Sequence, residues 1–553
     1  MATAFVRQLG YESGVQLNPL VDASEIPATG KADQVFGIIM RATRGRIDKP
    51  FVVDSGNVYN RLGSGETIRK NALNEAWVHV VEALNRGAYE AVVMRVVGAD
   101  AVNKWASVSL TAADGKASFA TKVETANLAD ATVGDGTLLF VKHVECFNDG
   151  FKIGLHVEAD ELDAGWVYLR LYDAAENKLF EFRGSLDPDA KDDYGNSAYL
   201  PDVVTAQTDL VEVSVAQTIK EAMTALEATS LITGYDYNAM GARDWYVSPT
   251  LVCFTEGATT YTAQQLQDAR VKLQKTPFDY AYISSGGSKD INLLNQLAQL
   301  AFDTNRQLRF DIDGSLTPEA AIAFKDRMNP GSNKTAHLLQ AFWSPFKSDD
   351  ISGVNPNGYI GTATLNIAYA CGRNAVKNAK GFAAKNYPIA GRNWPVERTG
   401  LMQTYFPSDK EFSQLAKAKI NPVIYDTYTG GGRYVFKDSL TCALVESSLK
   451  KLISVADMSS HIDDAVTRAG KDYLQLPMQV AIRRMSEYLQ KLFEDAQASG
   501  WLVPSNDPTM GGAAFKFEVV PDEQNPYDQM VVNYWLRYDG TVRQIYVTQT
   551  ITK

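Results

Sequence analysis

Short apolar runs alternate with an amphipathic segment in the first hundred residues. Residues 36–40 (FGIIM) and 89–97 (YEAVVMRVV) are apolar runs typical of buried strands. Between them, apolar side chains repeat at helical spacing, and Gly87 follows where a helix would end: Leu73, Trp77, Val80, Val81 and Leu84. This order predicts two parallel strands joined by a right-handed helical crossover.

The same alternation returns between residues 278 and 343. It predicts strands at 278–283, 308–312 and 337–343, with helices at 293–300 and 318–328 between them. Strand, loop and helix repeated in this way are typical of an open parallel sheet. We therefore predict a multidomain protein of the α/β (α+β mixed) class with an open α/β core.

Residues 101–245 have a different pattern. Strand-like runs at 137–141, 166–171 and 210–215 alternate with turns rich in Asp, Gly and Asn. Residues 101–200 hold 9 basic and 17 acidic side chains and thus carry most of the net negative charge of the chain. The pattern predicts an inserted, acidic, β-rich domain that faces solvent.

The C-terminal quarter predicts a helix followed by a hairpin. An apolar stripe at helical spacing ends before Gly500 and consists of Ala481, Met485, Tyr488, Leu489, Leu492, Phe493 and Ala496. Residues 531–538 and 541–547 alternate on either side of Asp539 and Gly540, a strong hairpin signal. Residues 548–551 lack a partner within that hairpin, so we expect an unpaired edge suited to another chain's sheet.

Length and charge limit the classes of function. A chain of 553 residues suggests two to four domains, and a net charge of −11 argues against a nucleic-acid binder. The sequence contains no run of 18 apolar residues and no signal-peptide pattern, so we expect neither membrane insertion nor secretion by that route. Neither the four cysteines nor the five histidines have metal-ligand spacing, and we expect no cofactor.

One basic stretch stands out in this acidic chain. Residues 371–419 hold nine basic side chains and three acidic ones. Such a stretch is a candidate electrostatic contact surface, and a merely solvated basic face is an equally good interpretation.

The sharpest enzymatic motif lies at residues 308–316 (LRFDIDGSL). It resembles the first motif of the haloacid dehalogenase-like phosphohydrolases, which would make Asp311 the nucleophile and Asp313 the general acid/base beside Mg²⁺. The family also needs a later lysine and a pair of acids, which could only be Lys347 and residues 349–350 here. These residues follow the first motif too closely to leave room for the two strand–helix units that the family has in between. The alternative is that Asp313 caps the following turn or helix.

The order of elements resembles the tail sheath proteins of contractile phage tails. Three stretches carry the resemblance: 36–98, with GII at 37–39, RAT at 41–43 and RLG at 61–63; 194–215, with LPDVV at 200–204; and 421–547, with GGGR at 430–433 and KKLI at 450–453. The family's Pro-Pro-Ser-Gly stretch is altered here to VNPNG at 354–358, which indicates a divergent member.

The resemblance implies a structural subunit without a reaction of its own. Hexameric rings of such subunits stack helically around an inner tube, and terminal arms pair with sheets of neighbouring subunits. Contraction triggered at the baseplate then drives the tube through the host envelope. The resemblance implies four kinds of partner: other copies of the chain, the inner tail tube protein, the baseplate proteins and the tail terminator protein. The location would be the virion tail, after assembly in the host cytoplasm.

The resemblance also assigns domains and contact residues. The domains are an extended N-terminal arm (1–35), the first part of the sheath core (36–100), the outward-facing insertion (101–245), an α/β domain (246–400), a C-terminal sheath domain (401–530) and a C-terminal hairpin and arm (531–553). The arm strands would use Phe5, Val6, Val542, Ile545, Tyr546, Val547 and Ile551. Basic residues facing the tube or other subunits would be Arg373, Lys377, Lys380, Lys410, Lys417, Lys419, Arg483, Arg484 and Lys491.

Overall fold

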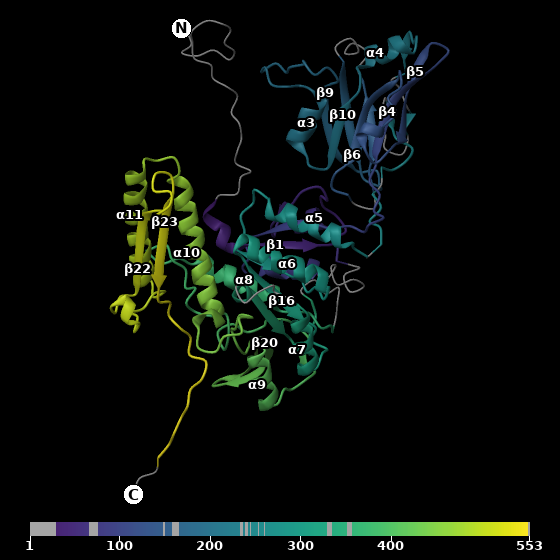
Figure 1. Ribbon diagram of the computed structural model, residues 1–553. Helices are drawn as coiled ribbons and strands as arrows, with labels where there is room; N and C mark the ends of the chain where they lie inside the picture. The colour runs from purple at the N-terminus through teal and green to yellow at the C-terminus, as the bar shows by residue number, and fades with distance from the viewer. Residues whose placement is uncertain are drawn as a thin grey trace.

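The chain folds into three bodies, which Figure 1 shows side by side: an α/β core around a central sheet, a β-rich insertion, and a C-terminal unit. The computed structural model describes residues 29–65, 76–146, 150–157, 165–232, 236–237, 242–243, 245–252, 254–258, 260–328, 335–350 and 357–550. The predicted N-terminal arm lies outside the described residues up to residue 28. Thr29–Gln34 then forms a short 3-10 helix, η1, that leads into the core.

The α/β core is built on an eight-stranded sheet in the order β2-β3-β1-β15-β16-β17-β20-β21. Its strands are β1 (Val35–Met40), β2 (Phe51–Val53), β3 (Glu90–Arg95), β15 (Tyr282–Ser284), β16 (Gln307–Ile312), β17 (Leu339–Trp343), β20 (Ile420–Tyr428) and β21 (Gly431–Phe436). The strands from β3 to β20 run parallel, and β2 and β21 pair antiparallel at the two edges. The predicted α/β class with an open parallel sheet is confirmed.

Helices cover both faces of this sheet. The strand β1 is therefore buried on both sides, which explains why its residues are apolar throughout. Phe36 and Ile38 face one apolar cluster, whereas Val35 and Ile39 face the other. The first cluster includes α2 (Ala76–Asn85) and α8 (Ala363–Ala375); the second includes α5 (Ala263–Gln274), α6 (Ile291–Thr304), α7 (Pro318–Arg327) and α9 (Asp409–Lys417). The core also contains α1 (Val58–Leu62), β18 (Phe346–Lys347) and β19 (Met402–Gln403).

The β-rich insertion consists of two sheets packed across one apolar core. One sheet has the order β10-β6-β4-β5-β11 and contains β4 (Trp105–Ala113), β5 (Lys116–Val123), β6 (Thr137–His143), β10 (Val211–Val215) and β11 (Ser230–Leu231). The other has the order β14-β7-β8-β9 and contains β7 (Lys152–His156), β8 (Trp166–Tyr172), β9 (Lys178–Ser185) and β14 (Tyr246–Val247). Remaining elements are α3 (Leu200–Gln207), α4 (Ile219–Ala225), β12 (Asp236–Tyr237) and β13 (Ala242–Arg243). The three strands predicted here are all present, and the domain boundaries at 101 and 245 stay a prediction.

The C-terminal unit, residues 453–536, joins two antiparallel strands to two helices. It comprises α10 (Ile453–Asp472), α11 (Met478–Ala498), β22 (Phe515–Pro521) and β23 (Met530–Leu536). The predicted apolar stripe of α11 is buried against the other three elements, with Leu489 and Phe493 fully inaccessible. The C-terminal helix is therefore confirmed.

The predicted C-terminal hairpin is wrong. β23 pairs antiparallel with β22, and residues 541–550 form no strand. A two-residue Asp-Gly hairpin loop usually forms a type I′ turn, which needs a left-handed backbone at both positions, and neither Asp539 nor Gly540 has a positive φ. Instead the N–H of Asp539 donates to the carbonyl of Trp501 at 3.0 Å, which directs the chain onward rather than back.

The described helices include none that is both long enough and apolar enough to cross a membrane.

Candidate assembly surface

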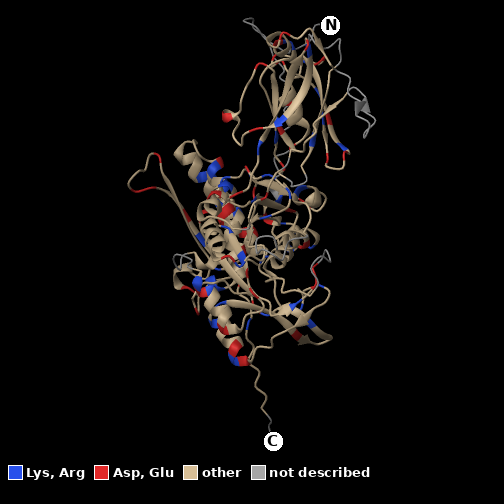
Figure 2. Cartoon of the chain, turned by 90° about the vertical axis from the view of Figure 1, so that its right-hand side faces the viewer, with Lys and Arg blue, Asp and Glu red and all other residues tan. Residues whose placement is uncertain are grey.

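The last described residues form an exposed, extended segment, residues 541–550. In both views this segment projects away from the rest of the chain (Figure 1, Figure 2). Its apolar side chains face solvent: Val542 is 78% exposed, Ile545 79%, Tyr546 87% and Val547 87%. Exposed apolar stretches of this kind are typical of interaction sites, which makes this segment a candidate contact surface. The other predicted arm residues, Phe5, Val6 and Ile551, lie outside the described residues.

The root of this segment is fixed to the body. Arg543 Nε donates to Asp438 Oδ1 at 2.8 Å, and the hydroxyls of Thr541 and Ser454 lie 3.4 Å apart. Ser454 belongs to the first turn of α10. The segment therefore leaves from a defined point on the C-terminal unit and becomes exposed directly afterwards.

The β22–β23 sheet is a second exposed feature. Among the described residues, no third strand joins it on either edge. Phe517, Val519 and Tyr534 pack inward on the helices, whereas Val520 and Trp535 are 36% and 45% exposed on the outer face. An isolated two-stranded sheet is marginally stable in water, so this one depends on its helices and has edges that can accept a strand.

Three of the predicted basic contact residues form an exposed row on α11. Arg483, Arg484 and Lys491 point to solvent because the opposite side of the helix is buried. Figure 2 shows basic and acidic residues interspersed along the core and the C-terminal unit rather than gathered by sign.

The basic stretch at 371–419 is not one surface. Arg373 is 7% exposed because its guanidinium donates to Asp457 Oδ2 at 2.7 Å inside the chain, and Lys419 is 9% exposed. The prediction that Arg373 and Lys419 face the tube or other subunits is therefore wrong, because both side chains are buried within the chain. Of the remaining candidates, Lys377, Lys380, Lys410 and Lys417 are exposed, and Lys380 lies 2.9 Å from Asp495 of α11.

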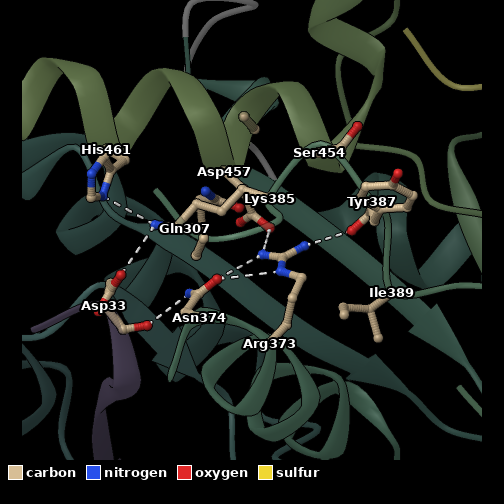
Figure 3. A network of polar contacts seen from close by, with 12 residues as sticks. Asp33, Gln307, Arg373, Asn374, Lys385, Tyr387, Ile389, Ser454, Asp457 and His461 are labelled. Carbon is tan, nitrogen blue, oxygen red and sulfur yellow. Dashed lines mark hydrogen bonds and ion pairs between the residues drawn. The ribbon is translucent and has the colours of Figure 1, made fainter. Parts of the chain in front are cut away.

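Sequence reasoning missed a buried charged network around Asp457 of α10, which Figure 3 shows in part. Asp457 Oδ1 accepts from Arg309 of β16 at 3.2 Å, and Oδ2 accepts from Arg373 of α8. Burial raises the pKa of Asp457, but the two guanidinium groups outweigh burial and hold this pKa below its usual value. Asp457 thus stays ionised and ties α10 to the central sheet.

Lys385 extends this network toward the N-terminal helix η1. Its Nζ lies 3.2 Å from His461 Nδ1 and 3.9 Å from Asp33, and Figure 3 shows it between them. Burial lowers the pKa of Lys385 to about 8 and that of His461 to about 3. A neutral His461 can accept the hydrogen bond of the ammonium. The only hint in the sequence would have been the position of Asp457 among apolar residues in the first turns of α10.

The motif residues Asp311 and Asp313 occupy different environments. Asp311 is 4% exposed, and its Oδ1 accepts the backbone N–H groups of Thr362 (2.7 Å) and Ala363 (2.8 Å) at the start of α8. A Cβ added to Gly361 would lie 2.1 Å from Asp311 Cγ, so backbone closes over the carboxylate. Asp311 therefore acts as an anionic partner of a helix N-terminus rather than as an accessible nucleophile.

Asp313 matches the capping interpretation. Its Oδ1 accepts the N–H of Ser315 at 3.0 Å, and its Oδ2 lies 2.9 Å from Lys289 Nζ. Within the described part of the chain, no group of three or more His, Cys, Asp or Glu residues could hold a metal ion. Cys146, Cys371 and Cys442 are buried free thiols.

The buried position of Asp311 makes the stability of the chain depend on pH. Burial raises the pKa of Asp311 to about 6, so ionising it between pH 4 and pH 7 costs the folded state free energy. Asp311→Asn does not ionise. The free energy of unfolding of Asp311→Asn relative to wild type should therefore rise by about 2–3 kcal/mol from pH 4 to pH 7 in urea titrations.

Asp313→Asn provides the control with the opposite sign. Burial raises the pKa of Asp313, but hydrogen bonds from Ser315 and Lys289 outweigh burial and lower it overall. Wild type gains stability from this group as pH rises through the lowered pKa, so Asp313→Asn should lose stability relative to wild type mainly below about pH 4 and change little between pH 4 and pH 7. Equal slopes for the two variants would contradict the assignment of Asp311 as a buried helix partner.

Comparison with known proteins gives structural neighbours only. No family model matches the chain, and no curated protein sequence matches it. The structure is similar to the sheath tail protein of Listeria innocua (TM-score 0.48, 11% identity, covering 92% of this chain and 98% of that one). It is also similar to the sheath tail protein of Desulfitobacterium hafniense (TM-score 0.45, 11% identity, covering 95% and 100%). A third neighbour is the contracted sheath of an extracellular contractile injection system (TM-score 0.40, 15% identity, covering 51% and 74%).

Proposed function

We propose that this chain is a structural subunit of a contractile tail sheath, which polymerises helically around an inner tube and contracts to drive the tube through a host envelope. The observation that carries the proposal is the exposed segment 541–550, whose apolar side chains have no cover in the single chain. Because its root is fixed to the C-terminal unit, the segment suits a contact with a second copy.

The acceptor for this segment is the β22–β23 sheet of another copy. A strand added at an open edge forms main-chain hydrogen bonds that tolerate sequence change and rotation of the bodies they join. Head-to-tail addition of this kind generates an open helical array when it does not close into a ring. The N-terminal arm, residues 1–35, would contribute a second such link.

The exposed row on α11 is the proposed contact with the inner tube. Arg483, Arg484 and Lys491 present charge without a large apolar surface, and charged contacts screened by salt can be separated during contraction. Lys377, Lys380, Lys410 and Lys417 would face neighbouring subunits, and the insertion would face outward. Baseplate and tail terminator proteins complete the proposed set of partners in a virion tail assembled in the host cytoplasm.

Removal of residues 541–553 tests the proposal. We expect wild type to form tubes or rings by negative-stain microscopy and the truncated chain to sediment as a monomer. Because residues 544–550 are exposed and the root contributes only one partly exposed ion pair and one hydroxyl contact, the truncated chain should keep a thermal unfolding midpoint close to that of the wild-type monomer.

Two variants at one position separate strand pairing from side-chain packing. Val547→Pro removes an amide donor and should abolish assembly, whereas Val547→Ala keeps that donor and should only weaken assembly. Tubes formed equally well by the truncated chain and by wild type would rule out this segment as the link between copies.

A further inference from the structure

Helix α10 has two faces of opposite character. One face carries Met458, Ile462 and Val466, which pack on α11 within the C-terminal unit. The other face follows the same helical spacing with polar residues that meet the α/β core: Asp457, His461, Asp464 and Arg468. The C-terminal unit is thus docked on the core through a row of polar pairs, here called the α10 seam.

The end of the seam near the α10 C-terminus is held by polar pairs. Asp464 Oδ1 lies 2.9 Å from Arg306 Nη2, and Arg468 Nη1 lies 3.1 Å from Asp279 Oδ2. The side chains of Arg468 and Asp279 are 39% and 37% exposed. The Arg306–Asp464 pair is less exposed, at 17% and 31%. Both pairs still reach solvent, so salt screens them and each contributes modestly to stability.

The other end of the seam is buried and also has apolar contacts. Asp457 and its two arginines are almost inaccessible to solvent. Trp501, fully buried after α11, packs edge-on against Phe382 of the core at 4.8 Å and donates from Nε1 to the carbonyl of Ala383 at 2.8 Å. This end is therefore attached firmly to the core.

The chain connection lies at this firm end. Residues 437–452 link β21 to α10, and Ile453 joins the apolar cluster of the core. The N–H of Ile453 donates to the carbonyl of Ser439 at 3.2 Å, so the start of α10 is held by backbone as well.

We propose that the α10 seam is a hinge, closed here, in which the C-terminal unit pivots about Asp457 and Trp501 while the Asp464–Arg468 end opens. The unit turns as a rigid body, because α11, β22 and β23 pack on one another and on α10, and this apolar cluster takes in the α/β core only at the pivot, through Phe382. This inference concerns the isolated chain and does not depend on the proposed function. In a sheath, it would give α11 and the segment 541–550 a second orientation.

Distances between paired spin labels in the full chain test the hinge. Phe302→Cys and Leu474→Cys place labels at exposed positions, 53% and 68%, on the core and the α10–α11 corner at the opening end. Val376→Cys and Gln497→Cys form the reference pair at the pivot end, where both positions are exposed. Cys253→Ser is included throughout, and the other three native cysteines are buried.

We expect one distance at both label pairs in wild type at low salt. Asp464→Asn, which loses charge opposite both Arg306 and Arg468, should add a second, longer distance at the 302–474 pair and leave the 376–497 pair unchanged. Raising NaCl from 0.1 M to 1 M should act in the same direction in the wild-type chain, because it shortens the screening length from about 10 Å to about 3 Å.

Asp303→Asn is the matched control. Asp303 forms an ion pair of similar exposure with Arg270 inside the core, at 2.6 Å, so its loss should leave both label pairs as in wild type. A single unchanged distance at 302–474 in Asp464→Asn at 1 M NaCl would overturn the hinge. Broadening at both label pairs would overturn it as well, because it would show detachment or unfolding rather than pivoting.

Discussion

Asp457→Asn should lower the free energy of unfolding by about 3–5 kcal/mol. Arg309 and Arg373, both buried, share the carboxylate of Asp457, and Asn would leave two guanidinium charges without a counter-charge. Removing one partner of a buried ion pair costs far more than removing an exposed pair, because the remaining charge cannot be solvated.

Urea unfolding of the full chain at pH 7 measures this loss. The two arginines hold the pKa of Asp457 below its usual value of about 4. Wild type therefore keeps the full stabilisation at pH values above about 4 and loses it as pH falls through the lowered pKa. The difference between Asp457→Asn and wild type should therefore shrink in acid. Glu181→Gln, which removes an exposed pair with Arg170, should cost less than about 1 kcal/mol. A similarly small loss for Asp457→Asn would mean that the network does not hold α10 on the sheet.

The central sheet could be predicted because the burial of each strand shows in the apolar residues of that strand alone. β1 is buried on both faces, so every side chain in it is apolar or glycine and no longer-range information is needed. The helix α11 could be predicted for a similar reason, since its stripe depends only on spacing along one helix.

The pairing of β23 could not be predicted by the same local rules. Asp539-Gly540 is a strong local hairpin signal, but β23 pairs with β22, whose inward residues Phe517 and Val519 pack on α11, and the backbone at the expected turn bonds to residues 501–503 instead. Packing on a helix stabilises the β22–β23 pairing, whereas a hairpin at 531–547 would have no such support. Tertiary contact thus overrode turn propensity.

The density of basic residues along the sequence was also a poor guide to which side chains are exposed. Arg373 and Arg398 lie in the most basic stretch, yet each is buried against an acid far away in sequence, Asp457 and Glu82. A count of charges within a window has no access to such partners. The α11 row was predictable because its exposure follows from the helix stripe itself.

Arg95 offers the second large effect, at the junction of the insertion with the core. Its side chain is fully buried at the end of β3 and donates to the carbonyls of Gly45 at 2.6 Å and Cys146 at 2.7 Å. It also pairs with Glu256, where the chain returns from the insertion, and Arg41 lies 3.0 Å from the same carboxylate. One guanidinium thus joins the core to both sides of the insertion.

Arg95→Met should therefore destabilise the junction by about 3–5 kcal/mol, because two buried carbonyls and part of a buried carboxylate lose their donor. The insertion has its own apolar core, so we expect the loss to appear as separation of the insertion from the core rather than as global unfolding. Calorimetry should show two transitions where wild type shows one. Limited proteolysis should cut near residues 98–104 and again near residue 256, and so release a resistant fragment.

Arg170→Met is the comparison, since Arg170 lies within the insertion and pairs with the half-exposed Glu181. This variant should keep a single transition and the wild-type cleavage pattern. Global unfolding of Arg95→Met in one transition, with no resistant fragment, would mean that residues 101–245 cannot fold apart from the core, because a body with a self-sufficient apolar core survives the loss of its attachment.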